Sequence, residues 1–242
     1  MDTSNNTRLH WNYFLALEKD LEAVSRYIEF SPDNFNTYSI ELAHLLLSAA
    51  SEADTLAKCI CGLLNPNARP SNINEYRKII KAAEDSQPSP FSGKGAQFKK
   101  ADDEVKHRLS GLMVYVPRYS LKCVPWESWA KDENPDWWHS YNKVKHERNL
   151  YFNKATLRNA LQSLAALLTL NYLYCRLEIS KAHPHHRYQY QGTSVTIRMG
   201  PQSTFIRFAE NFYVNPVAEL GRYINSVSED VKGLQNDLSE RD

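Results

Sequence analysis

Apolar residues recur every three or four positions along most of the first three quarters of the chain, and this helical period is the feature that most limits how the chain can fold. The two clearest stretches are residues 37–64 and 154–179, where the apolar positions build a wide face. Shorter stretches with the same period cover residues 8–30, 71–84 and 137–150. Helices that each have one apolar face bury those faces against one another. The sequence therefore predicts a mainly α fold, built as an antiparallel helical bundle.

Between residues 85 and 134 the helical period weakens, and proline and glycine residues interrupt every long element. A long irregular insertion is therefore predicted over residues 85–134. Trp126 and Trp129 lie within it, and we expect them to pack the insertion onto the helices, because large aromatic side chains dominate burial. An insertion of this kind is often a lid or a binding surface.

The character of the sequence changes after the long helical stretches. Residues 188–199 alternate between polar and β-branched types, and residues 204–214 are rich in aromatic side chains, which predicts a small C-terminal β-element. A last helix is predicted over residues 217–238. We therefore expect two parts: a helical bundle at residues 8–180, and a C-terminal part at residues 187–242 that packs on the bundle.

The net charge of +1 gives the protein no overall field that would attract nucleic acid or an anionic membrane, so an anion site must come from a local cluster of basic residues. The longest apolar run, residues 161–174, contains polar residues and falls short of the ~20 residues that span a bilayer. Residues 1–6 lack the apolar region of a signal peptide. The sequence thus predicts a soluble, intracellular protein without membrane contact.

The four cysteines support the same compartment. Without a secretory signal they indicate reduced thiols, so we expect a cytoplasmic protein. Cys59 and Cys61 are two positions apart in a helical pattern and point in different directions, so packing in the core is expected for them.

The segment from Trp137 to Asn149 holds the densest group of residues that can bind phosphate or move protons. On a helix, Asn142, Lys145 and His146 lie at i, i+3 and i+4 and share one face, and Arg148 lies on an overlapping edge. Neighbouring cations favour the neutral form of an imidazole, and a neutral imidazole can take a proton from an attacking hydroxyl. Lys145 and Arg148 could neutralise a phosphate, and Asn142 could orient the imidazole or the substrate. Such parts suit a metal-independent cleavage of RNA in which the ribose 2′-OH attacks the neighbouring phosphodiester.

A structural interpretation of the same segment stays open. Helices often carry His, Lys, Glu and Arg on a solvated face, and Trp137 and Trp138 could simply anchor the helix. His146 could also be a structural histidine that is bonded to a nearby carbonyl. A cluster of titratable residues indicates a functional site without proving one.

The stretch from Trp138 to Arg148, read as W-x-x-Y-N-x-V-K-H-x-R and followed by a Leu-rich helix, resembles the C-terminal helices of the HEPN superfamily. Glu41-Leu42-Ala43-His44 and Ser51-Glu52 in the preceding long helix fit the same four-to-five-helix bundle. The resemblance covers about residues 8–180, and the insertion at residues 85–134 matches poorly.

This resemblance implies a helical bundle that pairs as a homodimer. Members of the superfamily frequently act as ribonucleases in prokaryotic toxin–antitoxin or phage-defence systems, and others are non-catalytic partners. The usual catalytic signature is an Arg followed, after four to six residues, by a His. His146 matches the His, whereas positions 139–141 hold His, Ser and Tyr, and the nearby cations are Lys145 and Arg148.

Two functions are therefore carried forward. The first is an RNA-cleaving protein with catalytic residues His146, Arg148, Lys145 and Asn142, and with RNA and an antitoxin or defence protein as partners. The second is a non-catalytic helical module for dimerisation or interaction. No cofactor is predicted for either.

No metal site is predicted elsewhere in the chain. His183, His185 and His186 form the best metal-like cluster, but no Cys or carboxylate within a few residues completes a tetrahedral zinc shell. Gly93 and Gly95 flank Lys94 without the spacing of a phosphate-binding loop, so a solvated loop is favoured there.

Overall fold

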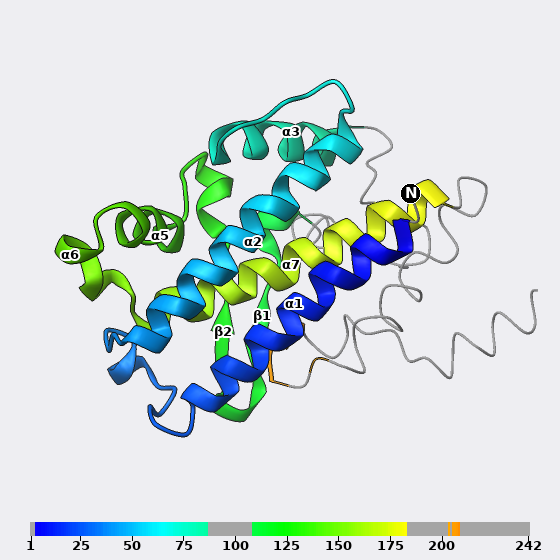
Figure 1. The fold of residues 1–242 in the computed structure, drawn as a ribbon. Helices are drawn as coiled ribbons and strands as arrows, with labels where there is room; N and C mark the ends of the chain where they lie inside the picture. Colours follow the sequence, from blue (N-terminus) through cyan, green and yellow to red (C-terminus); the bar gives the residue numbers. More distant parts are fainter. Residues whose placement is uncertain (1–2, 87–107, 183–202, 204, 209–242) are drawn as a thin grey trace, which may run out of the picture.

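The structure is a computed structural model that describes residues 3–86, 108–182, 203 and 205–208 (Figure 1). Several predicted features lie outside these residues: the strand at 188–199, the helix at 217–238, the histidine cluster near residue 185 and the glycine loop near residue 94.

Three long helices form the centre of the bundle: α1 (Thr3–Val24), α2 (Ile40–Leu64) and α7 (Leu157–Ala182). α2 and α7 begin beside each other, because Tyr38 and Thr156 form an antiparallel bridge just before them. From there α2 and α7 run in the same direction, and α1 runs along both in the opposite direction (Figure 1). The mainly α fold is thus confirmed, with α1 as the antiparallel member of the central three.

The predicted helices at residues 37–64 and 154–179 are confirmed, and each begins three residues later than predicted. The start of α2 is set by Ser39, whose hydroxyl accepts the Leu42 amide at 3.2 Å and so caps the helix. The first helix ends at Val24 and not at residue 30. There the Ser25 hydroxyl donates to the Glu22 carbonyl at 2.7 Å, a bond that competes with continuation of the helix.

The predicted short helix is α3 (Ile73–Asp85), which packs on α2. Asn72 caps it by accepting the amides of Asn74 and Glu75 at 3.1 and 3.2 Å. On its inner face, the Tyr76 hydroxyl donates to Asp54 of α2 at 2.9 Å, which joins the two helices.

The predicted irregular insertion is corrected in its second half, because it contains a β-hairpin. β1 (Val114–Val116) pairs with β2 (Leu121–Cys123), and Ser120 makes the turn with a positive φ of 54°. β3 (Arg207–Phe208) pairs with the other edge of β1, so the antiparallel strand order is β2–β1–β3. Strands of three residues show too little alternation to be recognised in the sequence.

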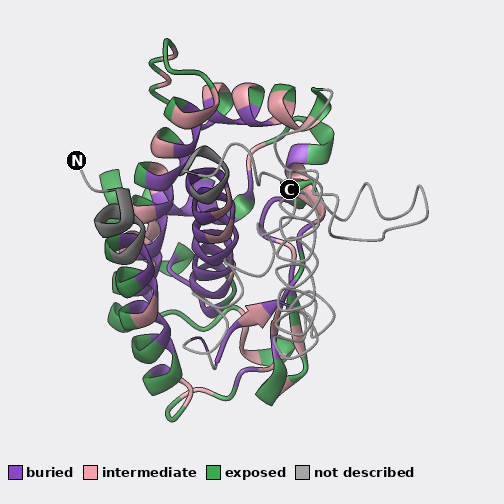
Figure 2. Cartoon of the chain, turned by 90° about the vertical axis from the view of Figure 1, so that its right-hand side faces the viewer, coloured by how far each residue is buried: buried purple, intermediate pink, exposed green. Residues whose placement is uncertain are grey.

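Figure 2 shows that the buried faces of the helices turn toward one another and toward this small sheet. Trp126 and Trp129 are almost fully buried, so the expectation that they pack the insertion onto the helices is confirmed. Cys61 and Cys123 are buried as well, and burial raises the pKa of each thiol to about 12, which keeps both protonated. Within the described part of the chain, none of the helices combines the length and the apolar character that crossing a bilayer requires.

The residues just before and just after the segment 87–107 are bonded to each other. The Leu109 amide donates to a carboxylate oxygen of Glu84 at 2.7 Å, and Arg108 pairs with Asp85 at 2.8 Å. Burial raises the pKa of Glu84, although the Leu109 amide and Arg108 act to lower it. The pKa of Glu84 is raised overall, so the charged form of its carboxyl group is less stable in the folded protein than in water.

Replacing that carboxylate with a neutral amide should stabilise the fold. A carboxyl group whose pKa is higher in the folded state favours folding at low pH, and this contribution is lost as pH rises through the folded-state pKa. Glu84→Gln keeps an acceptor oxygen for Leu109 and carries no charge, so we expect the free energy of unfolding to rise by about 0.5 kcal/mol at neutral pH, a typical size outside a core.

The gain should disappear below about pH 4, where the wild-type carboxyl group is protonated in both states. Urea unfolding at pH 7 and at low pH measures it. Asp85→Asn is the matched control, since Asp85 is exposed and only its surface ion pair is lost. A gain for Glu84→Gln that grows on acidification would contradict the assignment.

Candidate functional site

The segment that carries the predicted site begins with α5 (Asp136–His146), which Pro135 precedes. α5 begins one residue before the predicted start of this helix at residue 137. One face of α5 is buried against α2 and α7. The buried residues of α5 are Trp137, Trp138, Ser140, Tyr141 and Val144.

A cluster of tryptophans, whose rings meet at a tilt or edge-on, anchors α5. Trp126 lies 4.5 Å from Trp129 and 5.2 Å from Trp137 between ring centroids, and the cluster continues through Trp138 to Tyr141. Two indole N–H groups are used inside it. Trp137 donates to the Pro125 carbonyl at 2.8 Å, and Trp126 donates to Thr169 of α7 at 2.8 Å. The predicted anchoring role of Trp137 and Trp138 is therefore confirmed.

The helix predicted through residue 150 is corrected, because α5 ends at His146. Glu147 leaves the helical region with φ −137° and ψ 48°, and a separate short helix, α6 (Arg148–Tyr151), follows. Every residue from Lys145 to Leu150 is exposed, so no buried side chain ties a longer helix to the core. Asn142, Lys145 and His146 share α5 as predicted, whereas Arg148 belongs to the next element.

The predicted site residues differ in how firmly they are held. The Asn142 side-chain amide donates to the Trp138 carbonyl of its own helix at 3.0 Å. The Lys145 ammonium lies over the Tyr141 ring, 5.3 Å from its centroid, which favours one position for the cation. His146 and Arg148 are exposed, and neither forms a hydrogen bond or ion pair with another described residue.

The region is locally basic. Residues 137–158 contain five Lys or Arg and a single Glu, in a chain whose net charge is only +1. Lys143, Lys145 and His146 occupy the last turn of α5, where the unpaired carbonyls of a helix end favour cations. Cations beyond that turn, such as Arg148 and Lys154, are not explained by the helix end. The arrangement can therefore hold an anion at α6 and at the outer side of α5.

A second titratable cluster, which the sequence did not reveal, lies between α1, α2 and α7. His10 Nδ1 is 2.5 Å from a carboxylate oxygen of Glu52, and the ring of Tyr174 meets the imidazole edge-on at 5.5 Å. Burial, Glu178 and Cys59 raise the pKa of Tyr174 to about 12. Burial together with Glu52 and Glu178 also raises the pKa of Cys59, which makes its thiol a poor nucleophile.

This cluster is not a metal centre as it stands. Among the described residues, no group of three or more His, Cys, Asp or Glu side chains is placed to hold a metal ion. His10 and Glu52 are 42 positions apart, so only the packing of α1 on α2 brings them together. No local motif could have indicated the pair.

Comparisons of the chain with family models, with curated proteins and with solved structures gave no significant match.

The different roles of the buried and exposed sides of α5 can be separated by stability measurements. Trp137→Phe removes the donor to the buried Pro125 carbonyl and part of the ring, so we expect a loss of about 2 kcal/mol in the free energy of unfolding. His146→Ala removes an exposed ring and should change it by less than about 0.5 kcal/mol. Urea unfolding compares the two variants with the wild type. Equal losses would show that His146 has a structural role.

Proposed function

We propose that this chain is a HEPN-like protein that binds and cleaves RNA at the exposed ends of α5 and α6. The observation that carries the proposal is the local charge: residues 137–158 hold five cations and one carboxylate, and Lys143, Lys145 and Arg148 lie at the ends of α5 and α6. The inner side of α5 is anchored by the tryptophan cluster. A polyanion gains from several such cations at once, because each phosphate contact releases a condensed counterion.

The proposed cleavage needs one proton acceptor beside the cations. In it, His146 takes the proton of a ribose 2′-OH while the 2′-oxygen attacks the adjacent phosphorus. The P–O5′ bond breaks, the 5′-oxygen takes a proton from solvent, and a 2′,3′-cyclic phosphate remains. Lys145 and Arg148 would offset the charge that develops on the phosphate oxygens. The exposure of His146 and its lack of a described partner leave its ring nitrogens open for this exchange.

Asn142 has a different part in this proposal. Its amide N–H is committed to the Trp138 carbonyl, so only its remaining donor and its carbonyl oxygen are open to a ligand. We therefore assign Asn142 to positioning and not to proton transfer. The biological setting proposed is phage defence or a toxin–antitoxin system, with the chain acting as a homodimer in the cytoplasm and an antitoxin or defence protein as its partner.

A non-catalytic interaction module is the second candidate, and two observations favour it. The break at Glu147 places Arg148 outside the helix that carries His146. Positions 139–141 hold His, Ser and Tyr, so the Arg of the superfamily signature is missing at its usual distance before the histidine. On this alternative the same basic surface binds a partner and no bond is cleaved.

Cleavage is tested with labelled single-stranded RNA in the presence of EDTA. We expect the wild type to cut and to leave 2′,3′-cyclic phosphate ends, and His146→Ala to be slower by about 100-fold, the usual contribution of general acid–base catalysis. His139→Ala is the matched control, because His139 is also exposed on α5 and lies outside the proposed site. Equal rates for wild type and His146→Ala, or no cleavage by either, would remove the enzymatic proposal.

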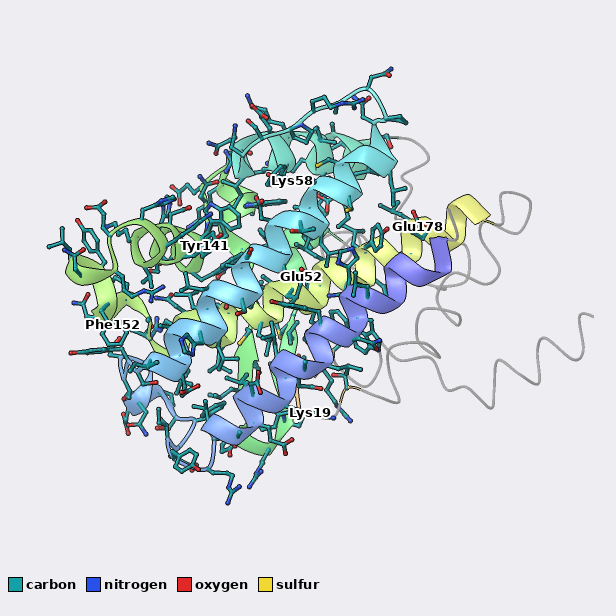
Figure 3. The ribbon with its side chains drawn as sticks, viewed as in Figure 1. Lys19, Glu52, Lys58, Tyr141, Phe152 and Glu178 are labelled. Atoms are coloured by element: carbon teal, nitrogen blue, oxygen red, sulfur yellow. The ribbon has the colours of Figure 1, made fainter. Side chains whose placement is uncertain are left out.

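Binding is tested apart from cleavage, by RNA anisotropy over a range of salt concentrations. The double variant Lys145→Glu with Arg148→Glu should lower affinity by more than about tenfold and reduce the salt dependence by about 1.4 ion equivalents, since each lost contact to a single strand removes about 0.7. Lys19→Glu is the control, because Figure 3 shows Lys19 on α1, away from Tyr141 and Phe152.

The two assays separate the candidates. If the wild type binds RNA and His146→Ala cleaves as fast as it does, the basic surface stands and the catalytic role fails. If charge reversal leaves the affinity unchanged, the RNA surface is wrong. Binding without cleavage supports the interaction module.

A further inference from the structure

A short segment from the far end of the sequence is built into the bundle. Phe205, Ile206 and Phe208 are buried, and they lie next to β1, where Figure 1 draws the segment in orange. The Phe205 ring meets Phe30 at 5.9 Å and Tyr119 at 6.0 Å between centroids. These neighbours are about 175 and 86 positions away in the sequence, so the contacts are purely tertiary.

One buried carboxylate holds the start of this segment. A single oxygen of Glu18, on α1, accepts the amides of Phe205 and Ile206 at 3.0 and 2.8 Å and the Ser203 hydroxyl at 3.0 Å. The Ser203 hydroxyl also contacts the Ile206 carbonyl, which closes the turn. Hydrogen bonds from several donors to a charged acceptor are stronger than neutral ones, and here they converge on one residue.

The end of the segment is held in a second way. β3 pairs with β1 in the register Val114 with Phe208 and Tyr115 with Arg207. The opposite edge of β1 is already occupied by β2. The segment therefore binds as an added edge strand, which is the way many proteins capture extended peptides.

We propose that the edge of β1, together with Glu18, Phe30 and Tyr119, is a strand-docking site for an extended apolar segment, occupied here by Ser203 and residues 205–208 of the same chain. The walls of the site are also held by contacts that do not involve the segment, since α1, α2 and α7 pack directly on one another and β1 is paired with β2. Its trans occupant is the same segment of a second copy, since an exchanged strand makes identical contacts and so costs little.

The chain is long enough for that exchange. Twenty residues separate the end of α7 at Ala182 from Ser203. An extended chain of that length spans roughly 65 Å, which exceeds the length of α7 itself. The exchange is independent of the proposed RNA surface, because none of its residues lies on α5 or α6.

Hydrogen exchange of the full chain tests whether the segment releases as a unit. The amides of Phe205 and Ile206 should exchange through local opening, faster than the core amides of α2 and α7. Glu18→Gln should speed their exchange by about tenfold, the effect of weakening charge-assisted hydrogen bonds. Glu22→Gln, an exposed carboxylate one turn further along α1, is the matched control. Exchange only at the rate of global unfolding, or no effect of Glu18→Gln, would overturn the proposal.

A labelled peptide with the sequence of residues 203–208 tests docking in trans. It should bind the full-chain variant Phe205→Ala with Phe208→Ala at least about tenfold more tightly than the wild type, because the native segment competes in the wild type. Adding Glu18→Gln should weaken capture, and a scrambled peptide should not bind. No capture by the folded variant, or equal capture of the scrambled peptide, would overturn the proposal. If that variant does not fold, the hydrogen-exchange result on the wild type decides.

Discussion

The hydrogen bond from the Trp126 indole to Thr169 of α7 is the contact on which the position of the candidate site depends. Thr169 is fully buried and its own hydroxyl donates to the Ala166 carbonyl, so the indole supplies a donor to an oxygen that has no access to water. Around this bond, the ring of Trp129 meets Trp126 at a tilt, and the ring of Trp137 meets it edge-on. The bond therefore joins the segment before α5 to α7, and this contact fixes the position at which α5 begins.

Because of this anchoring, α5 has one buried side that is held in place and one exposed side that is not. Its inner side is fixed by ring packing and by the buried indole donor of Trp137, whereas its outer side ends in cations that face solvent. Electrostatic binding of a polyanion works with such cations, because several mobile charges still neutralise several phosphates. Catalysis demands more, since a proton acceptor must be held close to the reacting group. The proposed RNA binding therefore asks less of this surface than the proposed cleavage, which would need further contacts to hold the exposed His146 in place.

The sequence predicted the long helices well because each buries a wide apolar face, and the period of that face is local information. The hairpin at residues 114–123 was missed, since β1 is only three residues long and its second partner lies about ninety positions away. The end of α5 at His146 was also missed. No glycine or proline marks Glu147, and every side chain from 145 to 150, the apolar Leu150 included, is exposed, so no burial favours a longer helix. Of the candidate site, the shared face of Asn142, Lys145 and His146 was predictable, and the separation of Arg148 was not.

The buried polar contacts of α1 explain how this helix finds its place. Its apolar residues, such as Phe14 and Leu21, would pack almost as well after a small rotation or slip, because apolar contacts have little directionality. Glu18 and His10 oppose such a rotation or slip of α1, because their hydrogen bonds are directional. His10 must meet Glu52 on α2, and Glu18 must meet the amides of the 203–208 segment, while an unpaired buried charge would be costly. Two directional contacts at different heights therefore fix both the rotation and the register of α1. The contact between Glu18 and the amides of Phe205 and Ile206 thus has two roles: it sets the register of α1, and it holds the segment in the strand-docking site.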